Sequence, residues 1–171
     1  MVKLTIDNQQ IEVEEGTTIL EAANKLYIDI PTLCYHENLS PSGACRLCTV
    51  EVISDGVSKL TTSCNYPVQQ AIEVRTNSGR AIEALKRGRE LLLAKCPHCE
   101  KIQSLAREMR VEKPRFELKE EECVLCGLCV RACQELTGIG AIRFIDRGMN
   151  RNVEEPLIEA STDICIGCGT C

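Results

Sequence analysis

Four closely spaced cysteines constrain this chain more than any other feature. They follow the spacing C-x2-C-x2-C-x3-C and are Cys123, Cys126, Cys129 and Cys133. Three more cysteines follow at the same two-residue interval, and these are Cys165, Cys168 and Cys171. One tight loop can present three thiolates with this spacing to three corners of a four-iron cubane, while the fourth cysteine, expected at the start of a helix, ligates a neighbouring cluster. The spacing therefore predicts bound iron-sulfur clusters.

Such crossing of ligands between two [4Fe-4S] clusters defines a two-cluster ferredoxin module. Zinc fits the spacing poorly, because structural zinc sites use paired C-x2-C units and close at four ligands. A disulfide scaffold fits poorly as well, because the thirteen cysteines are an odd number, fall in C-x2-C groups and follow no signal peptide. This use of cysteine indicates a reducing compartment, and we expect the cytoplasm.

A second set of ligands is expected nearer the N-terminus. Its spacing is C-x10-C-x2-C-x15-C, and its members are Cys34, Cys45, Cys48 and Cys64. A plant-type [2Fe-2S] ferredoxin has only four residues between its first two cysteines, but the C-x2-C pair and the distant fourth ligand are the same. The small residues Gly43 and Ala44 would let backbone N–H groups approach the bridging sulfides. We predict one [2Fe-2S] cluster here, and the alternative is a reduced loop with incidental cysteines.

Charge and composition exclude two classes of function. The net charge of −5 comes without a dominant basic patch, which argues against nucleic acid binding. No apolar run approaches the roughly 20 residues that a membrane span needs. Aromatic residues make up only 3% of the chain, so metal ligation is expected to supply folding energy that side-chain burial does not.

Local patterns predict the fold class as α+β. Residues 2–13 alternate as a hairpin, and Thr18 with Glu21 forms a capping box before an apolar helical stripe. Further strands are expected at residues 49–53, 59–62 and 72–74. This order predicts a ubiquitin-like β-grasp [2Fe-2S] ferredoxin domain over residues 1–78.

The rest of the chain is expected to form a helical connector, residues 79–115, and a two-[4Fe-4S] ferredoxin-like module, residues 116–171. Helical periodicity covers residues 78–95 and stops before Pro97, and a second helix is expected from residue 100 to a break at Pro114. The basic residues of the first helix, Lys86, Arg87 and Arg89, are expected on a solvated face. A strand is expected at residues 141–145, followed by an ordered excursion through Glu155-Pro156.

Several segments together resemble a known family. They are GTTILEAANKLYIDIPTLCYHENLSPSGACRLCTVEV, TTSCNYPV, EVRTNSGRAIEALKRGRELLLAKCPHCE and CVLCGLCVRACQELTGIGAIRFIDRG. They resemble the N-terminal iron-sulfur region of the large subunit of respiratory complex I. They are equally similar to the diaphorase gamma subunits of NAD-linked hydrogenases, to iron-only hydrogenases and to NAD-dependent formate dehydrogenases. The similarity extends over nearly the whole chain.

The resemblance implies one [2Fe-2S] and two [4Fe-4S] clusters with defined ligands. The [2Fe-2S] cluster would take the first four cysteines, and one [4Fe-4S] cluster would take Cys123, Cys126 and Cys129. The second [4Fe-4S] cluster would take Cys165, Cys168 and Cys171 with the crossing ligand Cys133.

The chain departs from the family between its two modules. There the family carries a His and three Cys around a further [4Fe-4S] cluster, whereas this chain keeps only Cys96 and Cys99, with Leu92 and Leu105 at the other two positions. The remaining pair would hold zinc with outside ligands, lend one thiolate to a neighbouring cluster, or be a remnant in a packed turn. We favour the remnant, because two thiolates do not complete a tetrahedral site. By the same argument His36 and His98 are expected to be polar loop residues rather than ligands.

The second departure concerns the fourth ligand of the cluster on Cys123, Cys126 and Cys129. The sequence stops at Cys171, before the cysteine that would supply this ligand. A chain terminus frays, so it is a poor place for a ligand, and we expect a longer polypeptide. Otherwise the ligand comes from Cys96, Cys99 or a partner.

These features predict an electron-transfer subunit of a cytoplasmic NAD(P)H-linked oxidoreductase complex. Gly138-Ile139-Gly140 is too short for a dinucleotide fingerprint, so a flavoprotein partner is expected to oxidise NAD(P)H and a catalytic hydrogenase or dehydrogenase subunit to exchange electrons at the other end. One alternative is the N-terminal electron-input region of a larger catalytic chain, such as an iron-only hydrogenase or a molybdenum formate dehydrogenase. Another is a zinc-stabilised interaction module without a redox role.

Overall fold

Residues 1–154 and 165–171 are described by a computed structural model of the chain. They divide into two units. The first unit contains residues 1–33 and 45–124, and the second contains residues 34–44 and 125–171. The expected excursion through Glu155-Pro156 lies outside the described residues.

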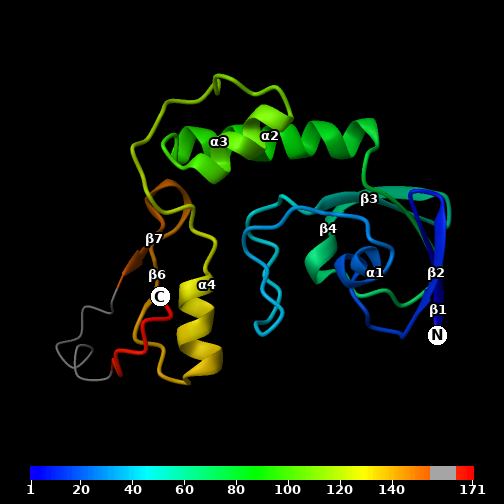
Figure 1. Cartoon of the computed structure of the whole chain (residues 1–171), viewed down its shortest axis with the longest axis horizontal. Coiled ribbons are helices and arrows are strands. Elements are labelled where there is room, and N and C mark those ends of the chain that lie inside the picture. The colour runs from blue at the N-terminus through cyan, green and yellow to red at the C-terminus, as the bar shows by residue number, and fades with distance from the viewer. Residues whose placement is uncertain (155–164) are drawn as a thin grey trace. The chain divides into compact units, whose positions relative to one another are not determined.

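A mixed sheet is the framework of the first unit (Figure 1). It has five strands in the order β2-β1-β5-β3-β4. The strands are β1 (Val2–Ile6), β2 (Gln9–Val13), β3 (Thr49–Ser54), β4 (Val57–Thr62) and β5 (Ile72–Arg75). β1 pairs antiparallel with β2 and parallel with β5, while β3 pairs antiparallel with both β4 and β5. The two hairpins predicted from alternation are therefore present. Their turns have the positive φ that two-residue hairpin loops require, at Asp7 and Asn8 and at Asp55 and Gly56.

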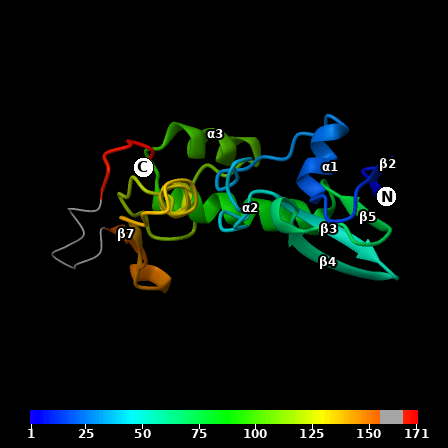
Figure 2. The same ribbon diagram turned by 90° about the horizontal axis from the view of Figure 1, so that it is seen from below.

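Helix α1 (Ile19–Lys25) packs on one face of this sheet (Figure 2). The predicted capping box begins it, because the Thr18 hydroxyl accepts from the Glu21 amide at 3.2 Å and the Glu21 carboxylate accepts from the Thr18 amide at 2.7 Å. The apolar stripe of the helix is buried, and so are the inward side chains of the strands. The largest fully buried side chains of this core include Leu4, Ile6, Ile19, Val50, Val52 and Val74.

Two helices continue the first unit. Helix α2 (Gly79–Lys95) begins with the Ser78 hydroxyl accepting from the Ala81 amide at 3.2 Å and ends before Pro97, as predicted. Helix α3 (Glu100–Glu108) packs alongside α2 (Figure 2), around a core of Leu93, Ile102, Ala106 and Val111.

Helix α3 is shorter than predicted, because a Schellman motif rather than Pro114 ends it. The amide of Arg110, in the left-handed conformation at φ 56°, donates to the Arg107 carbonyl, and the Val111 amide donates to the Ala106 carbonyl. Both bonds are 2.9 Å long. Since arginine rather than glycine occupies the left-handed position, the sequence carries no obvious stop signal there.

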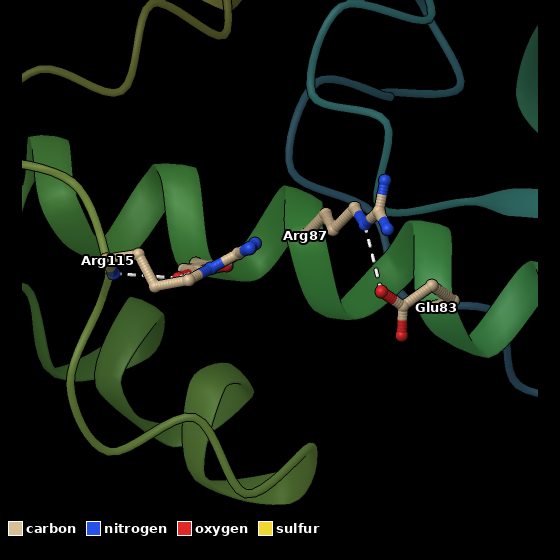
Figure 3. Close-up of polar contacts among 4 residues, drawn as sticks. Glu83, Arg87 and Arg115 are labelled. Carbon is tan, nitrogen blue, oxygen red and sulfur yellow. Dashed lines mark hydrogen bonds and ion pairs between the residues drawn. The ribbon is translucent and has the colours of Figure 1, made fainter.

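Arg89 is not on a solvated face, which corrects the prediction for the basic residues of α2. It is only 3% exposed, and its guanidinium donates to the Leu105 carbonyl at 3.0 Å and to the Glu108 carboxylate at 3.2 Å. Lys86 and Arg87 are exposed, and Arg87 pairs with Glu83 on the same helix at 2.9 Å (Figure 3). Arg89 therefore joins α2 to the end of α3.

Replacing Arg89 by Ala is expected to lower the free energy of unfolding by about 2–3 kcal/mol, because it leaves the Leu105 carbonyl unsatisfied and removes packed surface. Arg87→Ala is the matched control on the same helix. It should cost no more than about 0.5 kcal/mol, because an exposed i,i+4 pair contributes little. Chemical denaturation of both variants measures the difference, and equal stabilities would contradict a structural role for Arg89.

The segment after α3 is fixed to α2 by an ion pair. The Glu90 carboxylate accepts a hydrogen bond from the Arg115 backbone amide at 2.7 Å. It also accepts two from the Arg115 guanidinium, at 2.8 and 2.9 Å (Figure 3). These hydrogen bonds, with the positive charge of Arg115, lower the pKa of Glu90 to about 2. The carboxylate is therefore ionised at neutral pH, and the pairing weakens only as pH falls below the ordinary range of a glutamate.

The described residues of the second unit form few regular elements. Helix α4 (Leu128–Arg131) continues into a π-helical turn, η2 (Ala132–Leu136), and β6 (Arg143–Ile145) pairs antiparallel with β7 (Asn152–Glu154). The strand predicted at residues 141–145 is thus present, though shorter. Cys133 was expected at the start of a helix but lies in η2, five residues after α4 begins at Leu128. No helix in the described part of the chain is long and apolar enough to cross a membrane.

Candidate iron-sulfur sites

Three cysteines of the predicted [2Fe-2S] site lie in the first unit, in the loop before β3 and in η1 (Ser63–Asn65) after β4. Cys48 and Cys64 are fully buried, and Cys45 is half-buried. The hairpin of β3 and β4 brings the two segments together, and the Ser63 amide donates to the Cys48 carbonyl at 2.9 Å. The site therefore combines a C-x2-C loop with a distant cysteine, as the spacing predicts.

Ser63 fits a cluster at this position and was missed by sequence reasoning. Its side chain is fully buried, and its hydroxyl oxygen has no hydrogen-bond partner among the residues that the structure describes. A buried polar group without a partner is costly. The sulfur atoms of a cluster held by the adjacent Cys64 would give this hydroxyl an acceptor.

The fourth predicted ligand, Cys34, is the first residue of loop 34–44, which belongs to the second unit. Its side chain is fully buried. His36 follows in the same loop, where its Nδ1 accepts from the Asn38 amide at 3.2 Å, as fits a polar loop residue. The assignment of four cysteines to one [2Fe-2S] cluster stays a prediction.

The two C-x2-C-x2-C segments share one backbone pattern. In each segment the residues on both sides of the middle cysteine are left-handed. These are Leu125 (φ 54°) and Gly127 (φ 73°) around Cys126, and Gly167 (φ 64°) and Gly169 (φ 71°) around Cys168. Left-handed residues on both sides of a cysteine can turn successive N–H groups toward one concavity, the kind of anion-binding nest that many iron-sulfur sites use. Both segments therefore suit an anionic cluster.

Gly127 is also required for space. A Cβ atom at this position would lie 2.8 Å from the ring of Phe144, which lies in β6 of the same unit. A side chain would therefore displace either Phe144 or the cysteine loop. Glycine is needed for both its φ and its lack of a side chain.

Cys133 lies where its thiolate is favoured. The Ala141 amide donates to its Sγ at 3.2 Å. Burial acts to raise the pKa of the Cys133 thiol, but hydrogen bonds from the backbone of Ile142, Ala141 and Gly140 and from the Thr137 side chain outweigh it, so the pKa lies below its ordinary value. Since the thiolate is the form that binds metal, these groups suit a cluster ligand.

The remaining cysteines of the predicted ferredoxin-like module are more exposed. Cys123 is exposed, and Cys126 and Cys129 are half-buried. Cys165, Cys168 and Cys171 are exposed. Within residues 1–154 and 165–171, no three side chains of His, Cys, Asp or Glu are placed so that they could hold a metal ion. The ligand sets of both [4Fe-4S] clusters stay predictions.

Cys96 and Cys99 lie in the turn between α2 and α3. The Cys99 amide donates to the Cys96 carbonyl at 3.3 Å, and Cys96 is fully buried, which raises the pKa of its thiol. Leu105, at one of the positions where the family has a ligand, is 4% exposed, and Leu92 packs against the core between the helices. Apolar packing at both missing positions supports the packed-turn hypothesis. His98 is exposed.

Replacing Cys96 and Cys99 together by Ser is expected to leave the iron content unchanged, because the turn lacks further ligands, and to cause at most a modest loss of stability. Iron and acid-labile sulfide analysis of the anaerobically purified variant measures this. A loss of about four irons would show that other ligands complete a [4Fe-4S] cluster there.

Three comparisons with known proteins all find iron-sulfur domains or NAD(P)-linked oxidoreductases and hydrogenases. Residues 1–79 match the family model of a 2Fe-2S iron-sulfur cluster binding domain. The whole chain is 35% identical to the alpha subunit of an NADPH-Fe(3+) oxidoreductase of Geobacter sulfurreducens. It is 34% identical to a subunit of an NADH-quinone oxidoreductase of Rhizobium meliloti and 33% identical to the HndD subunit of an NADP-reducing hydrogenase of Solidesulfovibrio fructosivorans. The chain spans 23%, 23% and 34% of the lengths of these relatives, in the same order.

A solved structure is similar as well. It is a chain of an NAD+-reducing [NiFe]-hydrogenase crystallised in the H2-reduced state, with a TM-score of 0.76 and 30% sequence identity. The similarity covers 90% of this chain and 74% of that chain. It therefore extends well beyond the residues that match the 2Fe-2S model.

Proposed function

The chain belongs to the family of iron-sulfur electron-transfer subunits of NAD(P)H-linked oxidoreductases and hydrogenases, and we propose that it relays single electrons between a flavoprotein partner and a second redox centre. We assign one [2Fe-2S] and two [4Fe-4S] clusters to the cysteine sets described above. The β-grasp domain of residues 1–78 would carry the first and the module of residues 116–171 the others, joined by the connector of residues 79–115.

The matching backbone of the two C-x2-C-x2-C segments carries this proposal. Two segments about 40 residues apart have left-handed residues at the same two positions, so each can present thiolates and N–H groups to one anion. A zinc site needs four thiolates or imidazoles but no such nest, so this geometry favours clusters over zinc.

When bound, the clusters supply one-electron chemistry, and the chain's own residues bind and shield them. The buried Cys48 and Cys64 would hold one cluster away from water, with the Ser63 hydroxyl donating to its sulfur. The Ala141 amide, which contacts the Cys133 sulfur, would orient that ligand. Because hydrogen bonds to sulfur stabilise its negative charge, these donors favour the reduced state.

The proposal of a flavoprotein partner rests on the absence of a dinucleotide-binding motif from the sequence. The chain has no G-x-G-x-x-G fingerprint after a strand, so a flavoprotein subunit would oxidise NAD(P)H and convert hydride transfer into single-electron steps. A catalytic hydrogenase or dehydrogenase subunit would exchange electrons at the other end. Thirteen cysteines, eleven of them assigned here as cluster ligands, fit a reducing compartment, and we infer the cytoplasm.

The test is reduction of the purified protein with and without its co-purified flavoprotein, followed by the visible absorbance. We expect dithionite to bleach the isolated protein, NAD(P)H alone to leave it oxidised, and NAD(P)H with the flavoprotein to bleach it. Bleaching of the isolated protein by NAD(P)H would place a dinucleotide site in this chain. A colourless protein with bound zinc would refute the redox role altogether.

The lengths of the relatives favour a second candidate. This chain aligns with 34% of a hydrogenase subunit and 23% of two oxidoreductase subunits, so the same residues also suit the electron-input region of a larger catalytic chain. The mass of the intact native polypeptide separates the two candidates. A mass near 18.9 kDa supports the separate subunit, and a several-fold larger mass supports the larger chain.

A further inference from the structure

Arg131, the last residue of α4, donates two hydrogen bonds to loop 34–44. Its Nη1 donates to the Ser40 carbonyl and its Nη2 donates to the Cys34 carbonyl. The acceptors lie 91 and 97 residues away in the sequence but in the same unit of the structure. A guanidinium fork can engage two acceptors at fixed spacing, so it fixes the orientation of the loop as well as its position.

Glu135, one helical turn after Arg131, binds the same loop. Its carboxylate accepts from the Ser40 amide at 2.7 Å. Ser40 is therefore held through its carbonyl by a cation and through its amide by an anion. Charge-assisted hydrogen bonds are roughly twice as strong as neutral ones. The nearby Leu39 is buried, which also indicates a docked loop.

The position of Arg131 in the sequence links this contact to the predicted cluster ligands. Arg131 lies between Cys129 and Cys133, the assigned ligands of the two [4Fe-4S] clusters, and its guanidinium contacts the backbone of Cys34, an assigned ligand of the [2Fe-2S] cluster. One side chain therefore connects ligand segments of all three clusters. The Nε of Arg131 is buried and has no partner among the described residues, so part of this cation is shielded from water and its field is weakly screened.

We propose that Arg131 and Glu135 form a clamp that positions loop 34–44, and with it the [2Fe-2S] ligand Cys34, for electron exchange with the ferredoxin module. The proposal rests on the relay function above. Both are positioning residues, because neither is a cluster ligand. The fork would set the geometry of exchange, and the positive charge of Arg131 would raise the [2Fe-2S] reduction potential by favouring the more negative reduced cluster.

Four variants of the anaerobically purified protein with its partner subunits test the clamp. Arg131→Lys keeps the charge but loses the fork, and Arg131→Met loses both. Glu135→Ala removes the acceptor for the Ser40 amide. Arg143→Met, at an exposed arginine of β6 in the same unit, is the control for loss of one positive charge.

Three measurements separate positioning from general damage. Hydrogen exchange of the Ser40 amide is expected to rise by about tenfold or more in Glu135→Ala, given the strength of a hydrogen bond to a carboxylate. The [2Fe-2S] midpoint potential should fall in Arg131→Met by up to about 59 mV, which is a tenfold change in the ratio of reduced to oxidised cluster. Electron exchange between the cluster types after a light-driven pulse of reductant should slow severalfold in Arg131→Lys, with the potential near that of the unmodified protein. Arg143→Met should change none of the three.

The possible results distinguish failure of the proposed clamp from failure of the proposed electron relay. Unmodified protein that shows no exchange between its clusters would overturn both. Normal exchange in the unmodified protein, with unchanged rate in Arg131→Lys and unchanged Ser40 protection in Glu135→Ala, would overturn the clamp alone. If Arg131→Met fails to assemble its [2Fe-2S] cluster, Arg131→Lys and Glu135→Ala still decide, because slowed exchange in an iron-replete variant supports positioning.

Discussion

Replacing Cys48 by Ser should abolish the [2Fe-2S] electron paramagnetic resonance signal and leave the [4Fe-4S] signals. Cys48 is fully buried beside Ser63, in the loop before β3, and the sheet and α1 that support this loop contain none of the ferredoxin cysteines. The variant should lose about two irons out of the roughly ten expected for one two-iron and two four-iron clusters. Iron analysis and low-temperature spectra of the dithionite-reduced protein measure both effects.

Cys133→Ser is the reciprocal variant and serves as the control. It should remove [4Fe-4S] signal and keep the intensity of the [2Fe-2S] signal. Because Arg131 holds loop 34–44 from the helical turn before Cys133, the g-values of the remaining [2Fe-2S] signal are expected to shift slightly. Loss of every signal from either single change would contradict separate ligand sets.

The sequence predicted the first unit well because its signals are local. The turn at Asp55-Gly56 sets a hairpin, and the capping box of Thr18 and Glu21 starts α1 within one turn of the true boundary. Such features depend on residues no more than a few positions apart, so they can be read without the fold.

The ends of the helices were harder to predict. Both α1 and α3 end in a Schellman motif in which the left-handed residue is not glycine, with Tyr27 at φ 60° and Arg110 at φ 56°. In α3 the residue after Arg110, Val111, is buried in the core between the helices. Burial of an apolar side chain beyond the helix end thus stabilises a stop that backbone propensity disfavours.

The candidate sites show the same difference between local sequence signals and long-range contacts. The spacing of the cysteines predicts every proposed ligand, but the side chains that would support the ligands come from elsewhere in the sequence. Ser63 is an ordinary hydroxyl in the sequence, and the roles of Arg131 and Glu135 depend on a loop more than 90 residues away. Arg89 was expected in solvent for the same reason, since its partner Glu108 lies on another helix. Tertiary contacts of this kind leave no local signature.

Removing iron with a chelator under anaerobic conditions should unfold the second unit and leave the first folded. Among the residues of the second unit that the structure describes, the apolar core is small, and the buried side chains other than cysteine are Leu39, Val130, Ala132 and Ala141. Burial of these few side chains cannot offset the conformational entropy lost on ordering about 50 residues. Metal ligation by the cysteines therefore has to supply most of the folding free energy. The first unit buries side chains of a five-stranded sheet and of α1, and it has a further apolar core between α2 and α3, so its folding should not depend on iron.

Hydrogen exchange of the iron-free protein measures the two units separately. Amides of β6, β7 and α4 should lose nearly all protection, whereas those of β1, β3 and β5 should keep most of theirs. Reconstitution with iron and sulfide should restore protection, and zinc should not, because the left-handed residues around Cys126 and Cys168 suit a cluster rather than a tetrahedral ion. Full protection of β6 and β7 without iron would mean that packing alone folds this unit, and ligation would then stabilise an existing structure instead of creating it.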